Sequence, residues 1–145
     1  MNIVYKKLLP SPEDYNKLRE NVGWGTMPDS IVEKSFEKTI FGISVYKDES
    51  IIGSGRIVGD GGLCFYIQDI MVLKSFQNKG IGSEIVKLLM NYLEENAPFN
   101  SYIGLMASKG LEKFYSKYGF ISRPNDFFGS GMTQFWGRDG EMTEN

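Results

Sequence analysis

The segment that constrains this chain most is residues 77–83, which read Gln-Asn-Lys-Gly-Ile-Gly-Ser. It joins an apolar, strand-like run over residues 65–72 to a helix with strong apolar periodicity. Two glycines in the first turn of a helix allow a ligand to approach backbone N–H groups that have no partner within the helix. The positive end of the helix dipole and the Lys79 cation then favour an anion such as phosphate. The alternative is a tight strand-to-helix turn that only requires small residues.

Three kinds of phosphate-binding loop can be compared with this segment. A Walker-type loop has its lysine after the second glycine, whereas Lys79 precedes Gly80. A dinucleotide-binding fingerprint needs a third glycine near position 85, which is isoleucine here. The third pattern is Gln or Arg, two residues, Gly, one residue, then Gly or Ala, and Gln77, Gly80 and Gly82 match it without a departure. At this motif the sequence resembles the GNAT superfamily of N-acetyltransferases, which bind the pyrophosphate of acetyl-CoA there.

A second motif strengthens the resemblance. Residues 114–120 read Phe-Tyr-Ser-Lys-Tyr-Gly-Phe, similar to the Phe-Tyr-x-x-x-Gly-Phe signature that the family carries after its fifth strand. They follow a predicted strand over residues 101–107 and belong to a short predicted helix over residues 110–118, closed by Gly119. With both motifs in the family's order, the chain is identified as a GNAT superfamily member. The resemblance implies an α/β fold of the α+β type, with a central mixed, mostly antiparallel sheet flanked by about four helices.

The N-terminal half is predicted to be the front of the same domain. Ser11 starts a helix that ends near residue 21, because a serine N-cap is followed by proline and then by an acid three residues after the cap. A second helix is predicted over residues 30–38. Strands are predicted over residues 3–5, 42–46 and 51–58, the last two joined as a hairpin by a polar turn. No linker divides the chain, so a single domain over residues 1–145 is expected.

Composition narrows the choice of partners and location. The 145 residues are 41% hydrophobic and 23% charged, as in ordinary globular domains. A net charge of −2 argues against nucleic acid as a partner, and no apolar run is long enough to span a bilayer, so no membrane is expected. A single cysteine and the lack of a secretion signal favour the cytoplasm. Cys64 is expected to be a core thiol, because the chain has no histidine to activate it. A monomer or homodimer is expected.

Acetyl transfer to an amine requires a neutral nitrogen, a polarised thioester carbonyl and a proton for the departing thiolate. Alkyl amines have a pKa near about 10.4, so a proton must first be removed at neutral pH. Without histidine, a carboxylate or a chain of water molecules must take it. Asp69, three residues before Val72, is the best-placed acid. Its alternative role is a carboxylate that accepts structural hydrogen bonds, and Glu112 is a weaker candidate because a solvent-facing helix position explains it equally well.

Tyr115 is the predicted general acid. In the resembling family the tyrosine of the Phe-Tyr pair lies near the thioester sulfur, where it can protonate the leaving thiolate. A phenol with a pKa of about 10 suits that role. The alternative places Tyr115 on the apolar face of its helix with Leu111, Phe114 and Tyr118, and both interpretations can hold, since a buried ring leaves its hydroxyl available.

The resemblance also implies contacts with acetyl-CoA, the expected co-substrate, and no metal. Backbone groups of Ile70, Met71 and Val72 should lie along the pantetheine arm at a splayed strand edge, where one N–H could hold the thioester oxygen. The family often has asparagine after the fifth strand, where this chain has Ser108, which either replaces that contact or caps the next helix. Tyr115 is included among the cofactor contacts. The residues expected at the pyrophosphate are Gln77, Asn78, Lys79, Gly80, Ile81, Gly82 and Ser83.

The acceptor is expected to be a small-molecule amine or a peptide amine. In similar proteins the loop between the first two helices and the last hairpin line the acceptor side. Here they carry an apolar, aromatic set, although core packing explains each residue singly. Residues 125–136 are predicted to form a hairpin or a mobile flap. The substrate-binding candidates are Trp24, Met27 and Phe128, with Phe127 and Trp136 in the same set.

The leading hypothesis is an N-acetyltransferase that transfers the acetyl group directly within a ternary complex. The alternative is a non-catalytic module of the same fold that binds or senses acyl-CoA, which the missing histidine leaves open. A nucleotide-phosphate binder of another fold is disfavoured by the second motif.

Overall fold

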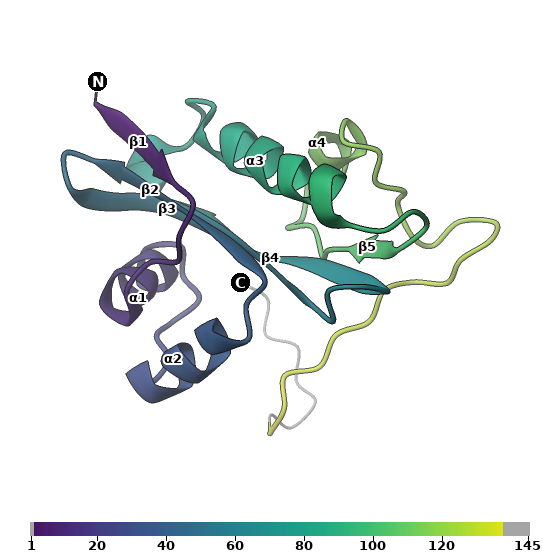
Figure 1. Ribbon diagram of the computed structural model, residues 1–145, viewed down its shortest axis with the longest axis horizontal. Coiled ribbons are helices and arrows are strands. Elements are labelled where there is room, and N and C mark those ends of the chain that lie inside the picture. The colour runs from purple at the N-terminus through teal and green to yellow at the C-terminus, as the bar shows by residue number, and fades with distance from the viewer. Residues whose placement is uncertain (1, 138–145) are drawn as a thin grey trace. The chain divides into compact units, whose positions relative to one another are not determined.

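Residues 2–137 are described by a computed structural model of the chain. The chain divides into two compact units, Met1–Leu105 and Met106–Asn145, and each is described by itself. Within the described residues, the N-terminal unit holds one sheet and three α-helices, and the C-terminal unit holds one short α-helix (Figure 1). A single domain over the whole chain stays a prediction.

The sheet of the N-terminal unit is mixed and mostly antiparallel, which confirms the predicted fold class. Its strands lie side by side in the order in which they follow one another in the sequence, and the pair β4–β5 is parallel. In the turn between β2 and β3, Asp48 and Glu49 have left-handed φ values of 48° and 71°, as a tight hairpin turn requires. The strands are β1 (Ile3–Lys6), β2 (Phe41–Lys47), β3 (Ser50–Gly59), β4 (Cys64–Val72) and β5 (Tyr102–Gly104).

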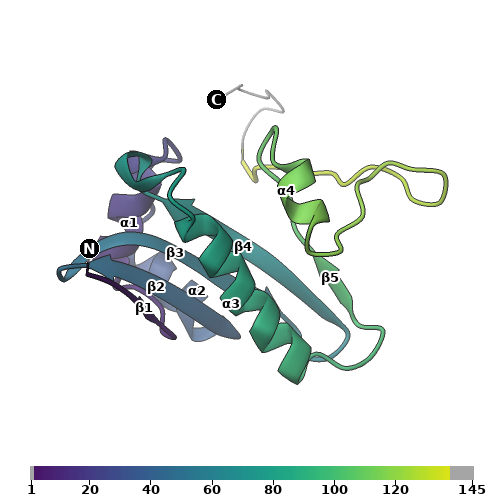
Figure 2. The same ribbon diagram turned by 90° about the horizontal axis from the view of Figure 1, so that it is seen from above.

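Helices cover both faces of this sheet. α1 (Pro12–Asn21) and α2 (Asp29–Glu37) lie on one face and α3 (Ile81–Asn96) on the other, as Figure 1 and Figure 2 show. The predicted N-cap of α1 is confirmed, because Ser11 Oγ accepts a 3.1 Å hydrogen bond from the Asp14 N–H. The first face is filled by an apolar cluster of Tyr15, Leu18, Val32, Ile51 and Met71, whereas α3 buries Ile81, Ile85, Val86, Leu89 and Leu93.

The turn between β3 and β4 is organised by one carboxylate. Asp60 Oδ1 accepts hydrogen bonds from the backbone N–H groups of Gly62, Leu63 and Cys64 at 2.8, 2.8 and 3.0 Å. These donors, that of Cys64 foremost, hold the pKa of Asp60 below its ordinary value. Cys64 itself is exposed at the start of β4, so the prediction of a core thiol is wrong. Phe65 points into the core, whereas Cys64, the first residue of β4, lies exposed at the end of the strand.

β5 is shorter than the predicted strand over residues 101–107. It pairs with β4 at Cys64↔Tyr102, Phe65↔Ile103 and Tyr66↔Gly104, and the ladder stops there. The residues after Gly104 have no paired strand beside them, so β5 ends there in spite of their strand-forming sequence. Beyond Tyr66, the pairs that β4 forms in the described part of the chain are with β3 alone.

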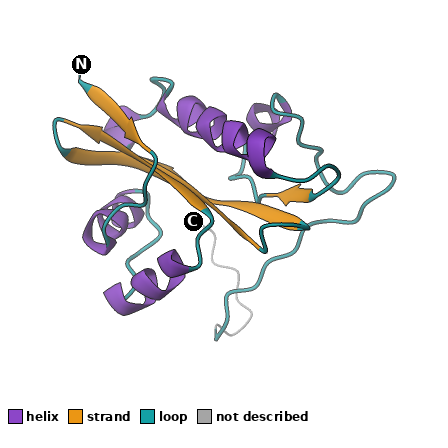
Figure 3. Cartoon of the chain, in the orientation of Figure 1, coloured by secondary structure: helices purple, strands orange, loops and turns teal. Residues whose placement is uncertain are grey.

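The C-terminal unit contains α4 (Glu112–Ser116), which is shorter than predicted. Gly110 has a left-handed φ of 92°, so the helix cannot begin there, and Gly119 follows its end with the predicted left-handed φ of 90°. Residues 120–137 form loops and turns without a strand (Figure 3), so both a hairpin over residues 125–136 and an element beginning at Phe120 are wrong. Instead, Asn125 Oδ1 accepts hydrogen bonds from the N–H groups of Phe127 and Phe128.

Across residues 2–137, no helix combines the length and apolar character needed to cross a membrane.

Candidate functional site

The N-terminus of α3 is exposed and carries no side-chain cap within the described chain. Gly80 is the N-cap residue, and the first hydrogen bond of the helix runs from the Glu84 N–H to the Gly80 carbonyl at 3.1 Å. The backbone N–H groups of the first turn therefore point to the surface at the positive end of a 16-residue helix. This is the geometry of an anion site.

The two glycines of this turn are needed for different reasons. Gly80 has a left-handed φ of 84°, which a side chain would strain. Gly82 lies outside the left-handed region, and a Cβ there would be 3.9 Å from Val72 Cγ2, an ordinary contact. Neither backbone conformation nor packing within the protein therefore requires glycine at position 82. The missing side chain leaves a space beside the first-turn amides, which fits a phosphate group better than it fits a mere tight turn.

Side chains tie the loop before α3 to the rest of the unit. Gln77 Nε2 donates to the Val72 carbonyl at 2.9 Å, so Gln77 closes the loop onto the end of β4. The Lys74 N–H donates to Asn21 Oδ1 at 2.9 Å, which connects the loop to the end of α1. Asn78, Lys79 and Ser83 are exposed, whereas Ile81 is buried. Of the predicted pyrophosphate residues, some therefore lie at the surface and Ile81 packs in the core.

The last residues of β4 lie directly before this loop. Met71 is buried in the apolar cluster, and Ile70 and Val72 are half-buried, so these side chains pack on the sheet and only their backbone groups are left for a ligand. Just before them the strand bulges: Asp69 has a left-handed φ of 58°, and the register with β3 shifts between Ser54 and Arg56. The backbone of residues 70–72 thus follows a bulge that contains Asp69, the predicted acceptor of the amine proton.

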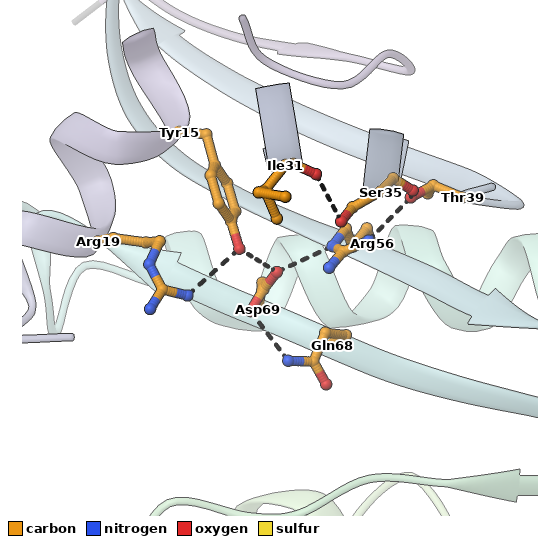
Figure 4. Close-up of polar contacts among 8 residues, drawn as sticks. All are labelled: Tyr15, Arg19, Ile31, Ser35, Thr39, Arg56, Gln68 and Asp69. Carbon is orange, nitrogen blue, oxygen red and sulfur yellow. Dashed lines mark hydrogen bonds and ion pairs between the residues drawn. The ribbon is translucent and has the colours of Figure 1, made fainter. Parts of the chain in front are cut away.

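The Asp69 carboxylate is buried and paired (Figure 4). Its Oδ2 accepts hydrogen bonds from the Tyr15 hydroxyl at 2.7 Å and from Arg56 Nε at 2.8 Å, and its Oδ1 accepts one from Gln68 at 3.1 Å. Arg19 Nη1 in turn donates to the Tyr15 hydroxyl at 3.4 Å. We call Arg19, Tyr15, Asp69 and Arg56 the Asp69 network.

The Tyr15 hydroxyl at the centre of the network is held in its neutral form. Burial, followed by the negative charge and hydrogen bond of Asp69, raises the pKa of the Tyr15 hydroxyl above its ordinary value, so Tyr15 is a neutral donor. The Asp69 side chain is only 3% exposed, and its charge is offset by the Arg56 guanidinium. Both oxygens of this carboxylate accept hydrogen bonds from protein groups, which favours the structural alternative for Asp69. Its role as a base stays a prediction.

The sequence predictions missed Tyr15, Arg19 and Arg56. One signal was present: Arg56 stands inside the apolar run of β3, and a charge on a buried strand needs a partner. Tyr15 offered no comparable signal, because its position also suits the apolar face of α1.

The loop between α1 and α2 presents two predicted substrate residues at the surface. Trp24 is 43% exposed and Met27 is 40% exposed. The loop backbone is fixed to α1: Asn16 exchanges hydrogen bonds with the Met27 N–H and carbonyl at 2.9 and 2.8 Å. Arg19 donates to the Gly25 and Trp24 carbonyls at 2.8 and 3.0 Å. Both side chains are therefore displayed by a backbone that is already ordered.

The remaining predicted residues lie in the C-terminal unit. Tyr115 is 8% exposed, its ring meets Phe114 and Phe120 edge to face, and burial raises the pKa of its hydroxyl. Ser108 is exposed and does not cap α4, whose N-cap residue is Leu111. Phe128 is 49% exposed.

Glu112, the weaker acid candidate, lies in the first turn of α4. Its carboxylate accepts a 3.1 Å hydrogen bond from the Gly110 N–H, which gives it a structural explanation. Among the described side chains, no three His, Cys, Asp or Glu residues gather as they would around a metal ion.

Comparison with known proteins identifies relatives. A family model described as an acetyltransferase (GNAT) domain matches residues 15–135. A crystal structure of a protein of unknown function from meticillin-resistant Staphylococcus aureus, a probable acetyltransferase, is 33% identical with a TM-score of 0.82, covering 92% of this chain and all of that one (100%). A GNAT-family acetyltransferase from Streptococcus pneumoniae is 25% identical with a TM-score of 0.74, covering 92% of this chain and 98% of its own.

A curated relative extends the comparison to sequence. The uncharacterized N-acetyltransferase ycf52 of Pyropia yezoensis is 27% identical over 127 residues, which are 85% of this chain and 70% of that protein.

Proposed function

Because this chain belongs to the GNAT family of acetyltransferases, we propose that it is an N-acetyltransferase that moves an acetyl group from acetyl-CoA to a primary amine. Family membership implies the use of acetyl-CoA. The observation that carries the proposal is the exposed N-terminus of α3, which no side chain of the described residues caps and where Gly82 leaves space beside the first turn. The proposed reaction is direct transfer within a ternary complex of enzyme, acetyl-CoA and amine.

The residues that would hold the pyrophosphate are those of the loop and first turn. Backbone N–H groups next to Gly80 and Gly82 provide donors, and the exposed Lys79 adds a positive charge. Gln77 contributes through the loop, because its amide is bonded to the Val72 carbonyl. Ile81 contributes by fixing the helix in the core.

The pantetheine arm would lie along the end of β4. The ladder with β5 stops at Tyr66, so the edge of β4 that follows has no β5 partner in the described chain. This supports the proposed backbone contacts at Ile70, Met71 and Val72. The group bound there supplies an activated thioester carbonyl, and one N–H of this edge is proposed to hold its oxygen.

Two protons must move during the reaction. Burial raises the pKa of Tyr115, so its hydroxyl remains protonated at neutral pH, as a donor to a departing thiolate must be. Asp69 is the proposed acceptor of the amine proton, but its two oxygens are already bonded to Tyr15, Arg56 and Gln68. That pairing gives more weight to a chain of water molecules, the other route open for this proton.

On the acceptor side we propose a hydrophobic or aromatic amine, or a peptide N-terminus. Trp24 and Met27 supply exposed apolar surface on an ordered loop, and Phe128 is the proposed contribution of the C-terminal unit. Ser108 is proposed as a supporting contact to acetyl-CoA.

Thermal unfolding with acetyl-CoA, followed by thiol release across an amine library, tests the proposal. Acetyl-CoA should raise the melting temperature, because a ligand that binds the folded state stabilises it. An apolar amine should then accelerate thiol release. Failure of every acyl-CoA to stabilise the chain would contradict the proposal.

A second function is favoured by one observation: the carboxylate of Asp69, the proposed acceptor of the amine proton, already accepts hydrogen bonds from Tyr15 and Arg56. A module that binds acyl-CoA without turnover would show the thermal shift with acetyl-CoA but no thiol release with any amine. The same pair of measurements therefore separates the two functions.

A further inference from the structure

We infer that the Asp69 network positions two parts of the proposed site against each other: the loop that carries Trp24 and the bulge of β4 at Asp69. Arg19, Tyr15 and Arg56 then act through other groups, as positioning residues. The inference rests on the proposed N-acetyltransferase function for the identity of those two parts as acceptor loop and cofactor strand.

At the loop end of the network, Arg19 holds the peptide groups around Trp24. Its Nε donates to the Gly25 carbonyl at 2.8 Å and its Nη2 to the Trp24 carbonyl at 3.0 Å. The Trp24 N–H donates back to the Arg19 carbonyl at 2.9 Å. The Arg19 side chain therefore holds the backbone at Trp24, while Asn16 holds the same loop further on, at Met27.

At the strand end, Asp69 adopts a φ of 58°, which few residues other than glycine adopt. Such a conformation persists when the surrounding structure determines it. Here the carboxylate is fixed from β3 by Arg56 and from α1 by Tyr15. Arg56 is itself held by a 2.9 Å hydrogen bond from its Nη1 to Thr39 Oγ1. The direction of the backbone after Asp69 depends on these side chains.

The Tyr15 hydroxyl joins the two ends. It donates to Asp69 and accepts from Arg19, whose guanidinium also lies 5.8 Å from the centre of the Tyr15 ring. The ring is 6% exposed and meets Phe36 edge to face, so it has little freedom to move. Both ends therefore bond to one hydroxyl (Figure 4), and we expect a displacement at one end to change the other.

The experiment uses Trp24 as a reporter. The chain has two tryptophans, and Trp136 is 92% exposed, so Trp136→Phe provides a parent protein in which Trp24 alone is observed. Two variants interrupt the network in this parent: Tyr15→Phe at its centre and Arg19→Gln at its loop end. Tyr92→Phe is the matched control, because its ring stacks on Phe41 and belongs to α3, on the opposite face of the sheet.

Two measurements without ligand report on the two ends of the network, one at Trp24 and the other at residues 67–72 of β4. Tyr15→Phe should raise acrylamide quenching of Trp24 by about twofold or more, the scale of coupling within one hydrogen-bond network. Arg19→Gln should speed amide hydrogen exchange in peptides covering residues 67–72. In the network, Arg19 connects to β4 through the Tyr15 hydroxyl, so such an effect would have to pass through Tyr15. Tyr92→Phe should change neither quantity.

In variants with native circular dichroism, the inference is overturned if Tyr15→Phe leaves the quenching of Trp24 unchanged and Arg19→Gln leaves the hydrogen exchange of residues 67–72 unchanged. If Tyr15→Phe fails to fold, unchanged exchange of residues 67–72 in Arg19→Gln alone overturns it, and faster exchange supports it. Acetyl-CoA provides a third arm: it should reduce Trp24 quenching in the parent but not in Tyr15→Phe. A parent that binds no acetyl-CoA contradicts the proposed function, while the two ligand-free measurements still decide the role of the network.

Discussion

Tyr15 and Asp69 are separated by 54 positions in the sequence, yet the hydroxyl of the first donates a 2.7 Å hydrogen bond to the carboxylate of the second. This bond connects the first helix to the bulge of β4, immediately before the proposed cofactor-binding edge. It is buried on both sides, with Tyr15 6% and Asp69 7% exposed. The relationship connects the N-terminal helix to the proposed site, even though the predicted motifs begin much later in the chain.

Loss of the Tyr15 hydroxyl should destabilise the protein. Tyr15→Phe removes one donor to a buried carboxylate, and we expect the free energy of unfolding to fall by about 1–3 kcal/mol. The pKa of Tyr15 is raised in the folded state, so its contribution is complete below the unfolded pKa of about 10 and is lost as pH rises through the higher folded value. Urea titrations of both proteins should differ by a constant amount between pH 7 and about pH 10, and by less above it. A difference that grows above that range would contradict this assignment.

Position 82 should distinguish binding from stability. Gly82→Trp fills the space beside the first-turn amides, so the rise in melting temperature with acetyl-CoA should disappear. Gly82→Ala is the control: its methyl group makes an ordinary contact with Val72, and alanine also fits the motif. It should retain the shift, and the protein without ligand should gain up to about 1 kcal/mol from the better helix propensity of alanine. Retention of the full shift by Gly82→Trp would exclude this turn as the pyrophosphate site.

Removal of the Tyr115 hydroxyl should lower turnover. If Tyr115 donates the proton to the departing thiolate, Tyr115→Phe should reduce kcat by about 10²-fold or more, the usual contribution of general acid–base catalysis. The affinity for acetyl-CoA, measured by calorimetry, should hardly change. Tyr118→Phe, two residues beyond the end of α4, serves as the control. Equal kcat values for the Tyr115→Phe and unmodified proteins would remove the proposed role.

Acid should reveal the role of Asp60. Its pKa is held below the ordinary 3.8, so the stability that its ionised form contributes is present above that value and is lost as pH falls through the lower folded pKa. Asp60→Ala should lower the melting temperature at neutral pH, because three backbone N–H groups lose their acceptor. Calorimetric scans should show this deficit shrinking below about pH 4. Asp60→Asn keeps an acceptor without a titrating proton, so its melting temperature should lack that pH-dependent part.

Local signals were sufficient for much of the fold. The serine cap of α1, the hairpin turn at Asp48 and Glu49, and the periodic helix after Gly80 each depend on residues close together in the sequence. The phosphate-binding role proposed for Gly80 and Gly82 likewise comes from a motif of neighbouring residues. The family resemblance added a central mixed, mostly antiparallel sheet, which local patterns alone do not determine.

Features that depend on distant partners were missed. At the bulge, Asp69 is bonded to Arg56 of β3 and Tyr15 of α1, which are distant in the sequence, so no local pattern in β4 predicts it. The length of β5 depends on how far β4 stays beside it, rather than on its own strand-forming residues. Residues 125–136 contain glycines that are typical of a hairpin. Instead, Asn125 Oδ1 accepts hydrogen bonds from the N–H groups of Phe127 and Phe128, which forms a local turn.

The strands of the sheet lie in the same order as they occur in the sequence. Each strand therefore finds its partner among its immediate successors, and short loops keep the entropy cost of closing β2, β3 and β4 into a meander small. During synthesis, those three strands can assemble with α1 and α2 before α3 has emerged from the ribosome. The edge of β4 proposed to receive acetyl-CoA would then form early, and the phosphate-facing helix would be added to a surface that already exists.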